Sequence, residues 1–103
     1  MGDKEIIYKV TSLIPQGKVL TYASLAKISG IKNPRVVGNY LHKNEDPHKI
    51  PCHRVVTSKG NVALRYAFGG DKIQIEKLLE EGVEIINGKV NLSKHLWNPQ
   101  APT

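Results

Sequence analysis

TYASLAKISGIKNPRVVGNYLHK, residues 21–43, predicts two short helices that follow one another closely. Thr21 can cap the first helix, and Gly30 is a typical residue for ending it. Asn33 followed by Pro34 is a strong start signal for the second helix, because it places a cap residue before a proline at the first helical position. Two such helices joined by a short turn indicate a helix-turn-helix, a spacing that many helical hairpins share.

The segments on either side of this pair are short. Apolar residues recur at helical spacing over residues 4–14 and again over 72–81, so we expect one helix before the pair and one after it. Asn87-Gly88 suits a type I′ turn and predicts a small hairpin over residues 83–92. Trp97 in the tail is expected to pack back on the body. These elements predict a fold that is mainly α with small β elements.

Length and composition indicate one folded domain over residues 1–103. No apolar run approaches the ~20 residues that a membrane span needs, and the N-terminus has no apolar region of the signal-peptide kind. The single cysteine excludes an internal disulfide and suits a reducing compartment. We therefore expect an intracellular monomer that makes no membrane contact.

Positive charge is concentrated in the middle of the chain. The formal net charge is +6, and residues 18–65 alone carry nine Lys and Arg against two acidic residues, whereas the flanks sum to −1. Such a basic block is the expected footprint of a face that binds a polyanion, although basic surfaces are also commonly just solvated. If the partner is a nucleic acid, binding weakens as salt rises, because the contacts release counterions.

The only cysteine lies in the run Ile50-Pro51-Cys52-His53-Arg54-Val55-Val56, which we expect to be extended. Thiolate is the reactive form of cysteine, and neighbouring cationic groups favour it. Cys52 beside His53 and Arg54 is therefore a candidate nucleophile, and a buried structural cysteine is the other interpretation. Adjacent side chains of a regular strand point to opposite faces, so direct proton transfer from Cys52 to His53 would be awkward.

The same run resembles the active-site signature of the O6-alkylguanine-DNA alkyltransferases, which carry Pro-Cys-His-Arg followed by apolar residues. The resemblance to their DNA-binding domain extends over nearly the whole chain, in the family's order. It implies a winged-helix-like helix-turn-helix domain that flips O6-alkylguanine out of double-stranded DNA. It further implies transfer of the alkyl group to Cys52, once per molecule and without a cofactor, with a water between Cys52 and His53. A DNA-repair methyltransferase is thus the first hypothesis.

The resemblance also suggests roles for single residues. Tyr22 looks like the tyrosine that contacts the flipped guanine, and Arg35 looks like the arginine finger that fills the space left by the extruded base. Asn44 is similar in place to the family's buried asparagine, and Glu81 resembles the acid that orients the histidine. Arg54, inside the basic block, is a further expected DNA contact.

Two regions depart from the repair enzymes. Residues 61–70 do not align cleanly with the enzymes' pocket loop; they and the tail over 87–99 are similar to the short alkyltransferase-like proteins. In that loop Arg65 resembles an arginine that senses the O6 edge of the lesion. The short proteins bind alkylated DNA without repairing it and commonly carry tryptophan in place of the acceptor cysteine. We also expect no counterpart of the amino-terminal domain that most full-length family members carry.

A non-enzymatic lesion sensor that recruits proteins of another repair pathway is therefore the second hypothesis. Cys52 argues against it, and the loop and tail argue for it. A plain helix-turn-helix regulator would leave Cys52 and Glu81 without a role. A zinc site built from His42, His48, Cys52 and His53 has suitable ligand types but no usual finger spacing, so we expect no metal.

Overall fold

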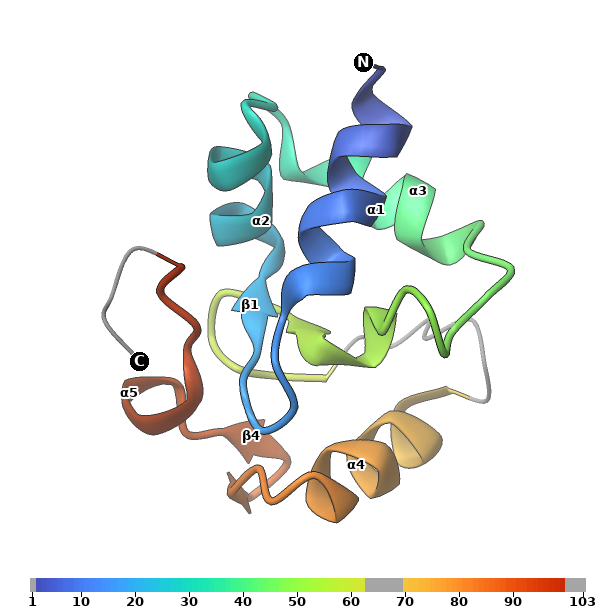
Figure 1. The fold of residues 1–103 in the computed structure, drawn as a ribbon. Coiled ribbons are helices and arrows are strands. Elements are labelled where there is room, and N and C mark those ends of the chain that lie inside the picture. The colour runs from blue at the N-terminus through green and yellow to red at the C-terminus, as the bar shows by residue number, and fades with distance from the viewer. Residues whose placement is uncertain (1, 63–69, 100–103) are drawn as a thin grey trace.

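The computed structural model describes residues 2–62 and 70–99, which form two halves joined by a short central ribbon (Figure 1). Helices α1, α2 and α3 make one half, and α4, a β-hairpin and α5 make the other. In chain order the elements are α1 (Asp3–Leu13), β1 (Leu20–Thr21), α2 (Tyr22–Ser29), α3 (Pro34–His42), the 3-10 helix η1 (Cys52–Arg54), β2 (Val55–Val56), α4 (Gly70–Glu80), β3 (Ile85–Ile86), β4 (Lys89–Val90) and α5 (Leu92–His95).

The predicted helix-turn-helix is present as α2 and α3. Thr21 and Ser24 form a capping box: the Thr21 hydroxyl accepts the Ser24 N–H at 3.0 Å, and the Ser24 hydroxyl accepts the Thr21 N–H at 2.8 Å. Gly30 ends α2 in the left-handed conformation, with φ 75°. Asn33 caps α3 by accepting the N–H of Arg35 at 3.0 Å. Local side-chain chemistry therefore fixes the limits of both helices, as the sequence predicts.

The short central sheet formed by β1 and β2 separates two hydrophobic clusters. β1 and β2 pair in parallel, with Leu20 opposite Val55 and Thr21 opposite Val56. Leu20 and Val55 belong to the cluster packed against α1, α2 and α3, whereas Val56 belongs with Leu78 of α4 to the second cluster. Because successive side chains of a strand point to opposite faces, one ribbon of two short strands contributes to both cores.

The carboxyl-terminal segment follows the prediction in two respects. β3 and β4 form an antiparallel hairpin, and Asn87 and Gly88 at its turn have φ angles of 53° and 76°, as a type I′ turn requires. Trp97 packs against the first cluster, and its backbone N–H donates to the carbonyl of Val19 at 2.8 Å. α5 is an addition to the prediction, since four residues are too few to show a helical period.

The segment around Cys52 corrects the prediction of a continuous extended run. Only Val55–Val56 is a strand, and the chain before it turns into η1. The Cys52 N–H donates to the carbonyl of Ile50 at 2.8 Å, and the Arg54 N–H donates to the carbonyl of Pro51 at 2.9 Å. These two short-range bonds tighten the backbone where apolar residues alone favour extension, so adjacent side chains of η1 do not alternate between faces.

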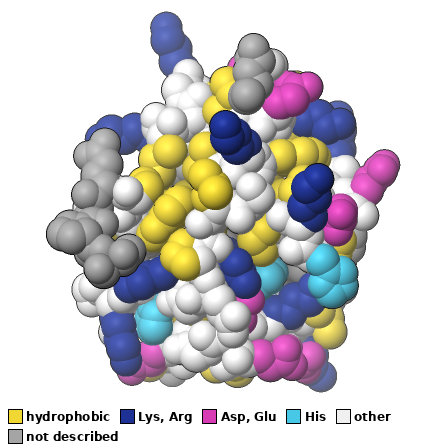
Figure 2. All heavy atoms as spheres, in the orientation of Figure 1, with side chains coloured by type: hydrophobic (Ala, Val, Ile, Leu, Met, Phe, Trp, Pro, Cys, Tyr) yellow, Lys and Arg dark blue, Asp and Glu magenta, His cyan; other side chains and the backbone are white. Residues whose placement is uncertain are grey.

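The surface formed by α1 and α2 is partly apolar. Figure 2 shows hydrophobic side chains gathered on this face with Lys and Arg around them. Leu13 of α1 and Ile28 of α2 are among the exposed large hydrophobic residues. Within residues 2–62 and 70–99, none of the helices combines the length and the apolar character that crossing a membrane requires.

Candidate active site

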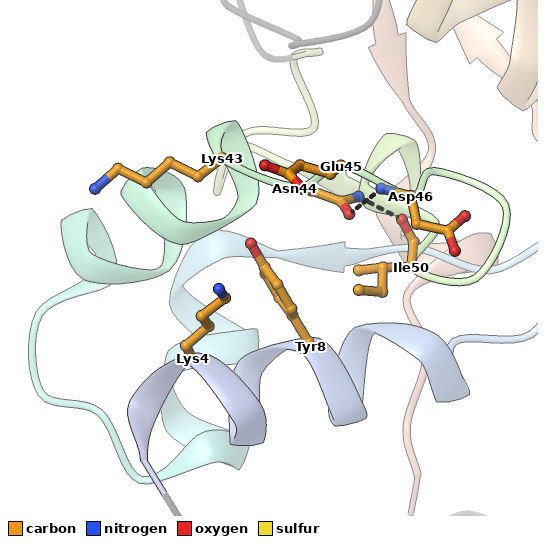
Figure 3. A pocket seen from close by; sticks show the side chains of 7 residues that line it. All are labelled: Lys4, Tyr8, Lys43, Asn44, Glu45, Asp46 and Ile50. Carbon is orange, nitrogen blue, oxygen red and sulfur yellow. Dashed lines mark hydrogen bonds between the residues drawn. The ribbon is translucent and has the colours of Figure 1, made fainter.

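Buried Asn44 holds the loop between α3 and η1. Its Nδ2 donates to the carbonyl of Ile50 at 2.8 Å, and its Oδ1 accepts the N–H of Asp46 at 2.9 Å (Figure 3). Both bonds fix the loop that leads into Cys52, so Asn44 is placed to support the site through the backbone. An open pocket of about 190 Å³ adjoins this loop and is lined by Lys4, Tyr8, Lys43, Asn44, Glu45, Asp46 and Ile50.

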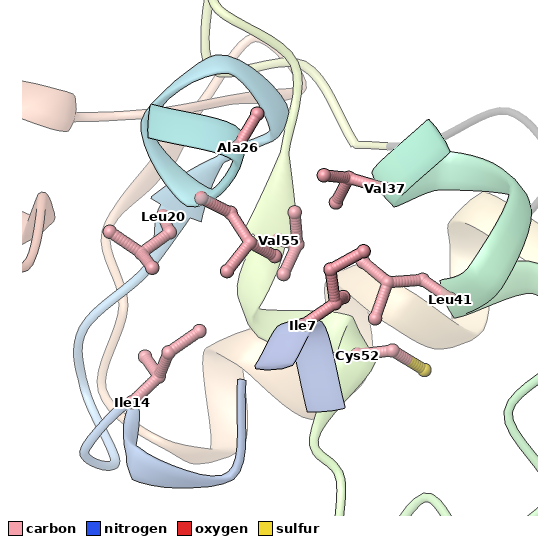
Figure 4. Close-up of a cluster of buried hydrophobic side chains, with 9 residues drawn as sticks. Ile7, Ile14, Leu20, Ala26, Val37, Leu41, Cys52 and Val55 are labelled. Carbon is pink, nitrogen blue, oxygen red and sulfur yellow. The ribbon is translucent and has the colours of Figure 1, made fainter. Parts of the chain in front are cut away.

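Cys52 is the first residue of η1 and forms no disulfide. The residue is 5% exposed and belongs to the cluster that also holds Ile7 of α1 and Leu41 of α3. Figure 4 shows the sulfur at the edge of this cluster. Cys52 shares this cluster with Val37 and Leu41 of α3, so the thiol lies next to the helix-turn-helix.

Two tyrosines lie near this thiol. Burial raises the pKa of Tyr22 to about 12, and the neighbouring Cys52 adds to the rise. Its ring also lies close to α3, since a Cβ added at Gly38 would stand 3.9 Å from it. Tyr8, which the sequence did not single out, also has a pKa raised by burial and by Cys52, and its hydroxyl donates to the Tyr40 carbonyl at 2.7 Å. The Tyr22 hydroxyl therefore stays protonated near neutral pH and can act as a donor.

A compact ionic group lies beside Cys52. The Arg54 guanidinium grips the Glu81 carboxylate with two nitrogens, from Nε to Oε1 at 2.9 Å and from Nη2 to Oε2. Its Nη1 donates to the carbonyl of Ile14 at the end of α1, at 2.8 Å. Nε2 of His53 lies 3.1 Å from Oε1 of Glu81. Glu81 therefore lies against the histidine that follows Cys52.

Burial and the contacts within this group together set the charges of His53 and Glu81. Burial lowers the pKa of His53 below the ordinary value of 6.5; the contact with Glu81 opposes this, and the charges of Arg54 and Lys77 reinforce it. For Glu81, burial alone would raise the pKa, but hydrogen bonds and charges of Arg54 and His53 outweigh it and hold the pKa below 4.5. Near neutral pH the carboxylate is thus ionised and paired with Arg54, and the imidazole is neutral.

A neutral imidazole carries one proton, and its position follows from the neighbours. A proton on Nε2 faces the carboxylate of Glu81, which favours that tautomer. Nδ1 then has a free lone pair. Nδ1 is buried and has no hydrogen-bond partner among the described residues. The geometry leaves His53 with a basic nitrogen that could take a proton in the site.

Gln74 is a second residue of this region that the sequence did not reveal. It is completely buried in α4, and its Nε2 donates to the carbonyls of His53 and Val55, both at 3.0 Å. The only signal in the sequence was a polar residue four positions before apolar Leu78 on the same helix, and this spacing does not identify the carbonyls that Gln74 binds.

The predicted DNA contacts fare unequally. Arg35 is exposed at the second position of α3, where it can reach a ligand. Arg54 is committed to Glu81 and to a backbone carbonyl, so a direct DNA contact stays a prediction. Arg65 lies outside the described residues. Across residues 2–62 and 70–99, no group of three or more His, Cys, Asp or Glu could hold a metal ion, so the alternative zinc site gains no support.

Comparison with known proteins identifies relatives of this arrangement. The family described as 6-O-methylguanine DNA methyltransferase, DNA binding domain, matches residues 4–83. Alkyltransferase-like protein 1 of Schizosaccharomyces pombe is 36% identical over 100 residues, which cover 90% of this chain and 92% of that protein. Methylated-DNA–protein-cysteine methyltransferase of Cricetulus griseus is 32% identical over 81 residues, and the match spans 78% of this chain but 38% of that protein.

A solved structure agrees with the sequence relatives. The crystal structure of S. pombe Atl1 in complex with damaged DNA containing O6-carboxymethylguanine superposes with a TM-score of 0.82 at 35% identity, covering 94% of this chain and 95% of that one. The similarity therefore includes both halves of the fold. The chain belongs to the O6-methylguanine DNA methyltransferase family, through the DNA-binding domain of that family.

Proposed function

We propose that this protein repairs O6-alkylguanine in double-stranded DNA by transferring the alkyl group to Cys52, once per molecule. The observation that carries the proposal is the juxtaposition of Cys52 with the His53–Glu81–Arg54 group. A nucleophile, a base and a carboxylate that orients the base are the three parts that activated nucleophiles need. The name of the relative from Cricetulus griseus, methylated-DNA–protein-cysteine methyltransferase, specifies a cysteine acceptor.

The transfer requires that the Cys52 thiol lose its proton. We infer that the proton passes to Nδ1 of His53 through the water that the family resemblance implies, while Glu81 stabilises the resulting imidazolium. The thiolate then attacks the alkyl carbon: a carbon–sulfur bond forms and the bond from carbon to O6 breaks. The electron pair stays on guanine, and the proton held by His53 is delivered through solvent to guanine, so guanine leaves neutral and His53 is neutral again.

Tyr22 fits the role of a donor to the departing guanine. Negative charge develops on the base as the carbon–oxygen bond breaks, and a hydroxyl fixed nearby lowers the energy of that state. The raised pKa of Tyr22 keeps its proton in place at neutral pH. Its position at the start of α2 links the DNA-reading helices to the thiol.

DNA engagement is assigned to α2 and α3. A base inside a duplex cannot present its O6 edge to a buried thiol, so it has to be flipped out at a cost of a few kcal/mol. Arg35, which is exposed at the start of α3, would fill the vacated space, and the basic block of residues 18–65 would hold the phosphates. Arg65 is proposed to sense the O6 edge of the lesion.

The second candidate is a lesion sensor without transfer activity. The observation that favours it is the match to Alkyltransferase-like protein 1 over 92% of that protein's length. The pairing of Arg54 with Glu81 points the same way, because a guanidinium already paired with a carboxylate is less able to stabilise a thiolate. A sensor would bind the flipped lesion as the repair enzyme does and would then recruit other repair proteins.

One measurement separates the two candidates. The protein is incubated with a duplex that contains one O6-methylguanine, and the intact mass is followed by mass spectrometry with peptide mapping. The repair proposal expects a gain of one CH₂, because a methyl group replaces a proton, located at Cys52 and saturating at one per molecule. Cys52→Ala is expected to abolish the gain and to keep binding to the lesion duplex. Lesion binding by the wild type with no gain in mass would overturn the repair proposal and leave the sensor.

A further inference from the structure

We propose that Gln74 is a positioning residue that fixes the turn carrying Cys52 and thereby sets the reactivity of the thiol. The proposal rests on the proposed function, since it concerns the same thiol. Gln74 has no exposed surface, and its amide nitrogen donates two hydrogen bonds of 3.0 Å, to the carbonyls of His53 and Val55. These carbonyls lie on either side of Arg54, so one side chain spans the end of η1 and the start of β2.

The turn needs such support. Three-residue 3-10 helices make few internal hydrogen bonds, and these have poorer geometry than those of an α-helix. The apolar and β-branched residues of Ile50–Val56 favour an extended chain. Two donors delivered from another helix therefore stabilise the turn relative to the extended alternative. A buried carbonyl that loses its donor is costly, so the two hydrogen bonds favour the turn strongly over the extended chain.

α4 and the residue that follows it contact the turn at two places. Gln74, Leu78 and Glu81 are spaced by four and three residues, so they follow one face of α4 and its C-terminal end. Leu78 is completely buried in the second cluster, which anchors that face. Gln74 binds the backbone of the turn, and Glu81 binds the side chains of His53 and Arg54. Gln74 and Glu81 thus hold His53 at two points, its backbone carbonyl and its imidazole ring.

The consequence concerns Cys52 directly. Its own position in η1 depends on the same turn, since the Val55 N–H donates back to the Cys52 carbonyl. If the turn relaxes toward an extended chain, Cys52 and His53 point to opposite faces and the proton path between them lengthens. Gln74 therefore influences the thiol without contacting the DNA.

The test uses two variants and a matched control. Gln74→Met keeps the size of the side chain and removes both donors, and Gln74→Glu keeps the size and places an acceptor against the two carbonyls. Glu76→Gln, on the exposed surface of the same helix, serves as control. Alkyl transfer from O6-methylguanine duplex is measured together with labelling of Cys52 by iodoacetamide over a range of pH. Cys52 is the only cysteine, so labelling reports on it alone.

Gln74→Met is expected to slow alkyl transfer about tenfold, the order of magnitude for losing one or two neutral hydrogen bonds. It should at the same time speed labelling of Cys52, because a loosened turn exposes the thiol. Gln74→Glu should shift the pH profile of labelling, because a carboxylate near His53 favours the imidazolium. Folding of each variant is checked by circular dichroism.

Folded Gln74 variants whose labelling rates and pH profiles match the wild type would overturn the inference. A wild type that labels but transfers no methyl group would instead overturn the proposed repair function, and the labelling data would still test Gln74. Slower transfer with unchanged labelling would also count against a positioning role, since it would indicate an effect on DNA binding alone.

Discussion

Breaking the ion pair between Arg54 and Glu81 by removing one partner should be among the most destabilising changes to a polar pair in this domain. Both side chains are mostly buried, with 16% and 13% of their surface exposed. Removing one partner of such a pair leaves an uncompensated charge and typically costs 3–5 kcal/mol, so we take about 3 kcal/mol for this partly hydrated pair. For a domain of this size, Glu81→Ala should then lower Tm by about 15 °C.

A double-mutant cycle isolates the pair from its surroundings. Glu81→Ala, Arg54→Met and the double variant are unfolded in urea, and the coupling energy is taken from the four stabilities. Arg54→Met also strands the carbonyl of Ile14, but that loss occurs in the single and the double variant and cancels. We expect a coupling of about 2 kcal/mol.

The chain supplies its own control. Lys94 and Glu84 form an ion pair at 3.8 Å with 64% and 41% of their side-chain surface exposed. The same cycle on that pair should give no more than about 0.5 kcal/mol, because water screens exposed charges. A coupling below about 0.5 kcal/mol for Arg54 and Glu81 would refute the argument and would mean that the pair does not hold the site together.

Three more outcomes follow from the structure. The native pKa of His53 lies below 6.5 and that of Glu81 below 4.5, so each residue contributes stability at pH values above its pKa in the unfolded chain and loses it as pH falls. The free energy of unfolding in urea should therefore decrease from pH 6.5 downward, and a maximum near pH 5 would contradict this. Gly60→Ala should cost about 3 kcal/mol, because its φ is 85° and a Cβ would stand 2.6 Å from the Val90 carbonyl, whereas Gly30→Ala, with φ 75° and open space, should cost about 1 kcal/mol; equal costs in urea unfolding would rule out the clash. Arg35→Ala should weaken binding to plain and alkylated duplex alike in anisotropy titrations, and unchanged binding at several salt concentrations would remove Arg35 from the interface.

The helix-turn-helix could be predicted because its signals are local. Thr21 and Ser24 are three residues apart, and Asn33 is two residues from the N–H that it caps. The preferences of these side chains act before any tertiary contact forms, so they can be recognised in the sequence alone. The same holds for the Asn87-Gly88 turn, where the required positive φ angles name the residues.

The geometry around Cys52 could not be predicted in this way. The turn at η1 is held by Gln74, 21 residues away from His53, and Arg54 is held by Glu81 and Ile14, 27 and 40 residues away. No periodic pattern links such positions, and the local preference of the segment pointed to an extended chain. Glu81 was reached only through a family resemblance, and Gln74 was not reached at all.

The difference between repairing a lesion and only sensing it should therefore depend on a few contacts of η1. The helices assigned to the DNA, α2 and α3, derive their limits from their own caps and would keep them with or without a reactive thiol. The reactive state that we propose needs Cys52 next to a neutral His53 whose Nδ1 can accept a proton, and in our proposal the contacts of α4 with the turn maintain that arrangement. Arg54 and Glu81 are bound to each other, so the charge of the guanidinium is already matched by a carboxylate. A chain can accordingly keep the reading helices and lose the chemistry by a small change at the turn, which is why the mass of Cys52 after exposure to the lesion is a better test of function than binding is.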